Sequence, residues 1–266
     1  LICAGLNNNL LAEELSPSLS RLERLLCKWF AERIGMPAGA GGVAASGGSL
    51  SNLMALVVAR NSAGLQHDSK AVVLVSKDAH VCFAKATRVM GLQPDSLEDV
   101  VTNEEGQISL KSLEEQLVRI RAEGRKCFAL VATAGTTVRG AIDPLTEIGM
   151  LCERENLWFH VDGAIGGVFA LANKTKNLLR GIALAKSITL NPQKLLGVTK
   201  TSSLLLVANQ SNLISTFATG LPYIEPSWGE HVHGGEMGLQ GTRPAEVLKL
   251  WLGLRQLGQR GIEKLL

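Results

Sequence analysis

The 266-residue sequence has few aromatic side chains, little excess charge and no long apolar run. Aromatic residues make up 4% of it, and tyrosine occurs once, at Tyr223. The formal net charge of +3 is small and is not gathered into blocks, which argues against a nucleic-acid partner. No apolar stretch approaches the roughly 20 residues that span a bilayer, and no secretion signal is visible. We therefore expect neither a nucleic-acid partner nor a membrane anchor.

Cysteine motifs are also lacking. The five cysteines show no C-x-x-C spacing, and their odd number and apolar surroundings favour reduced, buried thiols in the cytoplasm. They are Cys3, Cys27, Cys82, Cys127 and Cys152. No spacing typical of a metal site occurs, and the pair His231 and His233 is interpreted as part of a loop. We expect no bound metal.

The sequence does contain the composition of a compact α/β enzyme, with 46% hydrophobic residues and 28 glycines. Short apolar runs that predict buried strands alternate with amphipathic stretches that predict helices. The predicted strands are 71–76, 128–133, 157–161, 187–190 and 201–208. Three of the predicted helices begin near residues 16, 50 and 143, another covers 110–122, and the last follows Pro244. This alternation predicts a mostly parallel central sheet flanked by helices. Residues 38–42 are predicted to be a flexible connection, and 220–241 a long mobile loop.

A glycine-rich turn, Ser46-Gly47-Gly48-Ser49, precedes one predicted helix. The free N–H groups and positive dipole at a helix start bind anions, and glycines allow a phosphate to approach the backbone closely. Ser49 is interpreted either as the helix N-cap or as a phosphate ligand. Turns of small residues are common before helices, so an ordinary turn stays open as the alternative.

Two titratable side chains come at the ends of predicted strands, where open α/β sheets bind ligands. His80 follows the strand 71–76, and is interpreted as a stacking or acid–base group, or as a structural residue at a helix start. Asp162 ends the apolar strand 157–161 and should be desolvated, so it needs a cationic partner. The ring nitrogen of pyridoxal phosphate is such a partner. A helix cap or a turn is the alternative reading of Asp162.

One lysine follows the strand 187–190. The strand stops at Asn191-Pro192, and Lys194 comes two residues later, before the apolar segment 195–198. We expect this lysine to be shielded from solvent, which favours the neutral amine that forms Schiff bases with carbonyl compounds and with pyridoxal phosphate. A partly exposed loop lysine is the alternative.

In their order, these segments resemble the group II pyridoxal-phosphate-dependent amino acid decarboxylases, over essentially the whole chain. The matching motifs are Ser46-Gly47-Gly48-Ser49, Ala79-His80, Ala132-Thr133-Ala134-Gly135-Thr136-Thr137, His160-Val161-Asp162-Gly163-Ala164 and Asn191-Pro192-Gln193-Lys194. The resemblance implies that residues 1–266 form a fold-type I, transferase-like large domain that binds pyridoxal phosphate. The chain starts without methionine and ends inside a helical pattern, so we expect a segment of a longer polypeptide that lacks the family's N-terminal segment and C-terminal small domain.

The resemblance also implies roles for single residues. The implied catalytic residues are Lys194, His80, Asp162 and Tyr223, and the implied cofactor-binding residues are Gly47, Gly48, Ser49, His80, Thr137, Asp162, Ala164, Asn191 and Lys194. In this reading Lys194 is the Schiff-base lysine, Asp162 pairs with the ring nitrogen, and Tyr223 protonates the substrate carbon. Two residues depart from the family pattern: Gln193 replaces the histidine that usually precedes the lysine, and Gly163 replaces an alanine.

The implied reaction is decarboxylation of an L-amino acid to an amine and carbon dioxide. We expect a small polar or acidic substrate, such as glutamate, cysteine sulfinate, aspartate or 2,4-diaminobutyrate, and a homodimer with the active site at the subunit interface. Another reaction on the same fold, by a transaminase, an aldolase or a carbon–sulfur lyase, is the nearest alternative. A non-catalytic homologue acting as a partner subunit is the alternative from a different class.

Overall fold

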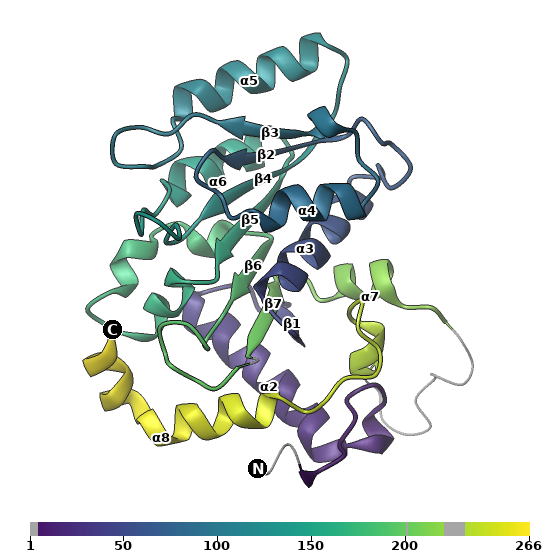
Figure 1. Cartoon of the computed structure of the whole chain (residues 1–266), viewed down its shortest axis with the longest axis vertical. Helices are drawn as coiled ribbons and strands as arrows, with labels where there is room; N and C mark the ends of the chain where they lie inside the picture. The colour runs from purple at the N-terminus through teal and green to yellow at the C-terminus, as the bar shows by residue number, and fades with distance from the viewer. Residues whose placement is uncertain (1–4, 201, 221–231) are drawn as a thin grey trace.

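A seven-stranded sheet forms the centre of the computed structural model, which describes residues 5–200, 202–220 and 232–266 (Figure 1). Its strand order is β1-β7-β6-β5-β4-β2-β3, and β7 pairs antiparallel with both β6 and β1 while the other neighbours are parallel. The strands are β1 (Gly41–Ala45), β2 (Val72–Ser76), β3 (Leu97–Val100), β4 (Cys127–Thr133), β5 (Trp158–Gly163), β6 (Ser187–Leu190) and β7 (Ser203–Val207). The predicted α/β fold with a mostly parallel sheet is therefore confirmed.

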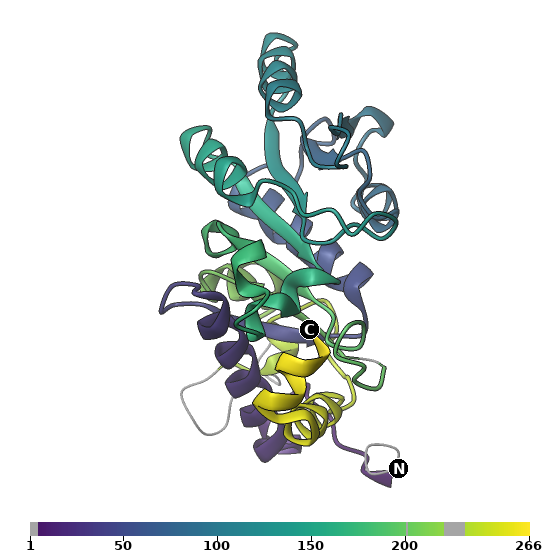
Figure 2. The same ribbon diagram turned by 90° about the vertical axis from the view of Figure 1, so that its left-hand side faces the viewer.

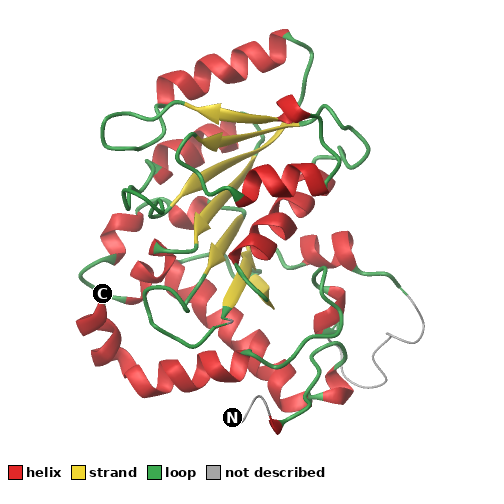
Figure 3. Ribbon diagram, in the orientation of Figure 1, coloured by secondary structure: helices red, strands yellow, loops and turns green. Residues whose placement is uncertain are grey.

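Helices follow most strands, as Figure 3 shows by its alternation of red and yellow segments. The α-helices are α2 (Pro17–Ile34), α3 (Gly48–Ser62), α4 (Cys82–Val89), α5 (Leu110–Ala122), α6 (Leu145–Arg154), α7 (Ser211–Phe217) and α8 (Val247–Leu265). Short 3-10 helices cover Glu13–Leu15, Pro94–Ser96, Gly166–Leu171, Lys176–Leu179, Ile182–Leu184 and Gly234–Glu236. None of the helices in these described residues combines the length and apolar character that crossing a bilayer requires.

The sheet is covered on both faces, which explains why its strands are almost continuously apolar (Figure 2). Alternate residues of β2 point to opposite sides: Val73 and Val75 belong to an apolar cluster that includes residues of α3, α4 and α7, whereas Val72 and Leu74 belong to one that includes residues of α2, α5, α6 and α8. Side chains of β4 divide between the same two clusters. The sheet is thus the middle layer between two apolar cores.

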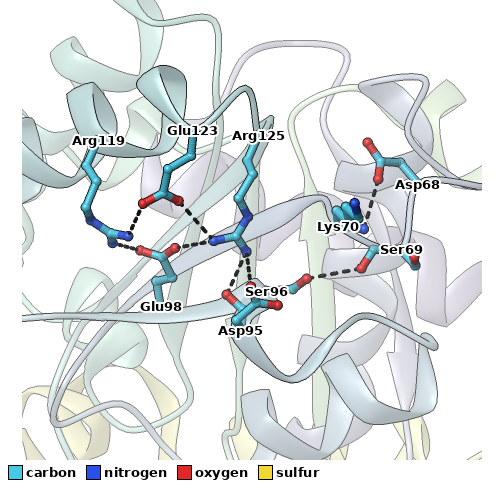
Figure 4. Close-up of polar contacts among 9 residues, drawn as sticks. All are labelled: Asp68, Ser69, Lys70, Asp95, Ser96, Glu98, Arg119, Glu123 and Arg125. Carbon is cyan, nitrogen blue, oxygen red and sulfur yellow. Dashed lines mark hydrogen bonds and ion pairs between the residues drawn. The ribbon is translucent and has the colours of Figure 1, made fainter.

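The edge strand β3, which the sequence analysis did not predict, is held by charged side chains (Figure 4). Glu98 on β3 accepts from Arg125 at 2.8 Å and also pairs with Arg119 of α5. Arg119 in turn pairs with Glu123 at 3.0 Å. A short strand with acidic residues lacks the apolar signature of a buried strand, but its charges suit an exposed sheet edge.

Residues 38–42 are not the flexible connection that was predicted, because Gly41 and Gly42 belong to β1. The β1 backbone lies so close to β7 that a Cβ atom on Gly42 would meet the carbonyl oxygen of Leu205 at 2.3 Å. Glycine is therefore required here by close packing inside a sheet, whereas a sequence pattern of small residues suggests only a loop.

The predicted mobile loop 220–241 is also only partly correct. Residues 221–231 lie outside the described residues, and His231 and Tyr223 with them. Beyond them, His233 and Glu236 are buried, and the His233 ring accepts the backbone N–H of Glu13 at 3.0 Å. This contact holds the segment after residue 232 against the start of the chain.

The parallel strands bring the predicted site together at one edge of the sheet. Thr133 of β4 is in register with Asp162 of β5, and Asp162 with Thr189 of β6. All three lie near the carboxyl ends of their strands, so the loops that follow start side by side. Asn191 and Lys194 belong to the loop that follows β6.

Candidate active site

A cavity of about 450 Å³ lies at this edge of the sheet. Every predicted site residue within the described part of the chain lines it: Gly47, Gly48, Ser49, His80, Thr137, Asp162, Ala164, Asn191 and Lys194. Tyr223 lies outside the described residues. A larger hollow of about 630 Å³ between α2 and α7 is lined by none of these side chains. The sequence therefore predicted a set of residues that the fold brings to one place.

Asp162 is buried, as predicted, with 5% of its surface exposed. One carboxylate oxygen accepts from the Asn52 amide at 2.9 Å, and the other accepts the backbone N–H of Ala164 at 3.1 Å. Both donors are neutral, so the described residues leave this carboxylate available to a cation in the cavity. The hydrogen bond from Ala164 is the kind of turn contact that the alternative reading of Asp162 predicted. Asp162 makes this contact and also lines the cavity.

The thiol of Cys82, which lies 3.3 Å from the Asn52 amide nitrogen, adds no charge beside Asp162. The pKa of Cys82 is raised to about 11, chiefly by burial, so the thiol stays protonated at neutral pH. The site around Asp162 thus holds one negative charge among neutral polar groups.

His80 serves two purposes. Its Nδ1 atom accepts the backbone N–H of Cys82, the first residue of α4, at 3.2 Å. The ring is exposed and lines the cavity. The structural reading of His80 as a helix-start residue is confirmed, and the same hydrogen bond orients the ring at the cavity wall.

The glycine-rich turn leads directly into α3. Gly47 is the N-cap and the helix begins at Gly48, so the reading of Ser49 as N-cap is wrong. Among the described residues, no acceptor receives the backbone N–H groups of Gly48 and Ser49, which lie at the positive end of the helix. A Cβ atom on Gly48 would meet the Asn191 side chain at 2.5 Å, so only glycine lets the turn approach the loop after β6 this closely.

Lys194 lines the cavity but is exposed, so the prediction that it is shielded from solvent is wrong. The backbone N–H of Lys194 donates to the backbone carbonyl of Asn191 at 2.9 Å, which closes a turn after β6. From this turn the Lys194 side chain reaches solvent. The apolar segment after it misled the prediction, because Leu196 and Val198 are buried while Lys194 and Leu195 face outward.

The residues present fit pyridoxal phosphate. A phosphate suits the free N–H groups of Gly48 and Ser49, a protonated ring nitrogen suits the carboxylate of Asp162, and an aldehyde suits the amine of Lys194. Three buried side-chain oxygens of cavity-lining residues, on Asp78, Thr133 and Asn191, have no hydrogen-bond partner among the described residues. Buried polar atoms normally have partners, so these three atoms also favour a polar ligand at this place.

Several residues of the cavity wall were assigned no role from the sequence. They include Asn52, Asp78 and Thr133, although Thr133 belongs to a matched motif, and Gln193 was noted only as a departure from a motif. The side-chain amide oxygen (Oε1) of Gln193 accepts the backbone N–H of Ser202 at 2.6 Å, which ties the loop after β6 to the start of β7. Asn52 could have been suspected, because an amide three residues after the turn falls on the first turns of the same helix.

The fold and the residues that line this cavity fit a phosphorylated, ring-containing cofactor at the carboxyl edge of the sheet, and comparison with known proteins agrees. The chain matches the pyridoxal-dependent decarboxylase conserved domain over residues 1–266. It is 36% identical to the aromatic-L-amino-acid decarboxylase of Bacillus atrophaeus over 243 residues, which are 90% of this chain and 50% of that protein. It is 34% identical to the cysteine sulfinic acid decarboxylase of Mus musculus over 275 aligned residues, covering 99% of this chain and 56% of that protein.

The crystal structure of mouse CSAD superposes with a TM-score of 0.92 at 33% identity, covering 99% of this chain and 56% of that one. The chain therefore belongs to the pyridoxal-phosphate-dependent amino acid decarboxylase family, as its motifs suggested. It spans about half the length of the relatives that it matches.

Proposed function

We propose that the protein decarboxylates an L-amino acid with the help of pyridoxal phosphate, giving an amine and carbon dioxide. The observation that carries the proposal is that Lys194 and Asp162, 32 positions apart in the sequence, line one cavity together with a helix N-terminus suited to phosphate. The family of the chain supports the same chemistry. We also infer that residues 1–266 form the cofactor-binding domain.

Pyridoxal phosphate, when bound, supplies a ring that accepts the electron pair left by departing carbon dioxide. Lys194 would hold the cofactor, because its amine suits the cofactor aldehyde. The Asp162 carboxylate would accept a hydrogen bond from the ring nitrogen and favour its protonated form. His80, at the cavity wall, would be the residue that packs against the cofactor ring.

The remaining residues hold the cofactor in place. The backbone of Gly47, Gly48 and Ser49 binds the phosphate, and its N–H groups need no rearrangement to do so. Thr137, Ala164 and Asn191 complete the contacts, by their positions on the cavity wall. We assign protonation of the substrate carbon to Tyr223 on the strength of the motif resemblance alone, since this residue lies outside the described part of the chain.

For the substrate we propose a small polar or acidic amino acid. The matched relatives include proteins named for an aromatic amino acid and for cysteine sulfinic acid at similar identity. The polar lining of the cavity, with Asp78, Gln193 and Thr136, favours the polar class over an aromatic side chain. A second candidate reaction, transamination or carbon–sulfur lysis, uses the same residues and is separated from decarboxylation by its products.

We also propose a homodimer in the cytoplasm. The cysteines of the described residues, Cys27, Cys82, Cys127 and Cys152, are all free thiols, which suits a reducing compartment. The dimer is inferred from the family resemblance, in which the active site lies at the subunit interface.

The test is to incubate the purified protein and pyridoxal phosphate with a panel of L-amino acids and to measure released carbon dioxide and the organic product. We expect carbon dioxide and an amine from a polar or acidic substrate, and loss of the visible cofactor absorbance in Lys194→Ala. A keto acid as the main product would replace decarboxylation by transamination. An unchanged spectrum and retained turnover in Lys194→Ala would refute the site.

A further inference from the structure

Behind Asp162, buried polar groups of α3, β5 and β6 form one continuous hydrogen-bonded chain. The indole N–H of Trp158 donates to the Ser187 hydroxyl at 2.8 Å, and that hydroxyl lies 2.8 Å from Nδ1 of His160. Nε2 of His160 lies 3.0 Å from the Asn52 carbonyl oxygen, and the Asn52 amide donates to Asp162 at 2.9 Å. Trp158 is 5% exposed, Asn52 2%, and Ser187 and His160 are fully buried.

The direction of each hydrogen bond follows from the groups at the two ends of this chain, the Trp158 indole, which can only donate, and the Asp162 carboxylate. An ionised carboxylate can only accept, so the Asn52 NH2 group must face Asp162 and its carbonyl oxygen must face His160. That oxygen requires a hydrogen on Nε2 of His160. Burial lowers the pKa of His160 to about 4, so the ring carries a single proton at neutral pH and Nδ1 must accept. The Ser187 hydroxyl then donates to Nδ1 and uses a lone pair to accept from Trp158.

The reverse direction leaves groups unpaired. With the proton on Nδ1, the His160 ring could donate to the Ser187 backbone carbonyl, which lies 3.2 Å away. Nε2 would then accept, and the Asn52 amide would have to turn and present its oxygen to the Asp162 carboxylate. Two acceptors would face each other unless Asp162 took up a proton, and the Ser187 hydroxyl would lose its acceptor. The tautomer of His160 and the charge of Asp162 are therefore linked.

We propose that Trp158, Ser187, His160 and Asn52 are positioning residues that form a one-directional hydrogen-bond chain and hold Asp162 as an acceptor-only carboxylate aimed at the cofactor ring nitrogen. This deepens the proposed function and rests on it for the identity of the ring. The linkage between the His160 tautomer and Asp162 is a property of the protein without cofactor. It can therefore be measured separately.

The first experiment reads the tautomer directly, by nitrogen-15 NMR of the purified, cofactor-free protein labelled in its histidine rings. We expect His160 with the hydrogen on Nε2. In Ser187→Ala the only remaining neighbour of Nδ1 is the backbone carbonyl, an acceptor, so we expect Nδ1 to gain hydrogen. Ser203→Ala is the matched control, because Ser203 is buried on the neighbouring strand β7 and its hydroxyl has no partner among the described residues. Hydrogen on Nδ1 in the unaltered protein would overturn the proposal, as would an unchanged His160 spectrum in Ser187→Ala.

The second experiment measures the affinity for pyridoxal phosphate by absorbance titration. We expect Ser187→Ala to lower it about tenfold or more, because the changed His160 tautomer would cost Asp162 its hydrogen bond from Asn52, and a hydrogen bond to a charged group is worth about that factor. Ser203→Ala should leave the affinity unchanged. Equal affinity of Ser187→Ala and the unaltered protein would overturn the positioning role. Absence of cofactor binding by the unaltered protein would instead refute the proposed function. The tautomer measurement would still show whether the hydrogen-bond chain from Trp158 to Asp162 has the proposed direction.

Discussion

Two polar networks of this protein differ in almost every physical respect. The network at the sheet edge joins β3 to α5 through Glu98, Arg119 and Arg125, and the Arg119 side chain is 49% exposed (Figure 4). The network behind the cavity runs through neutral side chains to a single charge, Asp162, and is almost wholly out of water. Arg119 can exchange its partners for water at little cost, although Glu98 and Arg125, at 11% and 14% exposed, are largely shielded. The groups behind the cavity have no substitute for any of their partners.

This difference predicts where substitutions matter. Exposed ion pairs contribute about 0–1 kcal/mol each, because solvent screens the charges and ordering two long side chains costs entropy. A buried donor or acceptor that loses its partner costs about 1–3 kcal/mol. Substitutions in the network behind the cavity should therefore reduce activity. Substitution of the exposed Arg119 at the sheet edge should lower only stability, and by little.

The largest effect is expected from Asp162→Asn. This change keeps the shape of the side chain and an oxygen for the Asn52 amide, but it removes the one charge of the buried network. We expect carbon dioxide release to fall by about 10²–10³, the usual size of a lost electrostatic contact at a reacting centre. Assays at saturating cofactor and a thermal melt on the same sample check this. Activity within a few-fold of the unaltered protein, with an unchanged melt, would show that the charge is not used.

His160→Phe should give the largest loss of stability. Phenylalanine fills the space, but it leaves the Asn52 side-chain oxygen without a donor and the hydrogen of the Ser187 hydroxyl without its acceptor, so we expect the free energy of unfolding to fall by about 2–5 kcal/mol. Urea denaturation measures it. His67→Phe is the matched control, because His67 is exposed and its change should stay within about 0.5 kcal/mol. Equal effects of the two changes would contradict the contrast between buried and exposed polar groups.

The same histidine should impose a pH dependence on stability. Burial lowers its pKa from 6.5 to about 4, although the neighbouring Asp162 acts in the opposite direction. Between these values the unfolded chain binds a proton that the folded protein does not, so stability falls as the pH falls from 6.5 to 4. The full contribution is about 3 kcal/mol.

Asp143 opposes this trend, since burial raises its pKa from 3.8 to about 6 and its contribution to stability falls as the pH rises through that range. The unaltered protein and His160→Phe both keep Asp143, so the difference between their unfolding free energies isolates His160. That difference should shrink steadily from pH 7 to pH 4. A difference that is constant with pH would mean that the pKa of His160 is the same in the folded and the unfolded protein.

The two networks also show what the sequence alone could predict. His80, Asp162 and Lys194 were found because they follow apolar strands, and parallel strands bring such ends together. Trp158, His160 and Ser187 lie inside those strands, where the apolar pattern hides them, and their bonds join residues up to 108 positions apart. A histidine and a serine in otherwise apolar buried strands were the available signal.

The errors have the same origin. Gly42 was assigned to a loop because small residues resemble a linker, and only the contact with Leu205 in the folded sheet shows why glycine is needed. Lys194 was predicted to be shielded because apolar residues follow it, yet a turn points it outward. In both cases the deciding neighbour is distant in sequence or depends on the geometry of a turn.

The smallest effect is expected from Arg119→Ala at the sheet edge. Arg119 pairs with Glu98 and Glu123, but Glu98 keeps Arg125 at 2.8 Å when Arg119 is lost. We expect the free energy of unfolding to change by about 1 kcal/mol or less, and less still at high salt, because screening weakens exposed pairs. Carbon dioxide release should be unchanged, since Arg119, Glu98 and Glu123 are not among the residues that line the cavity. A loss of activity without a loss of stability would connect the edge of the sheet to the cavity and remove the distinction between the two networks.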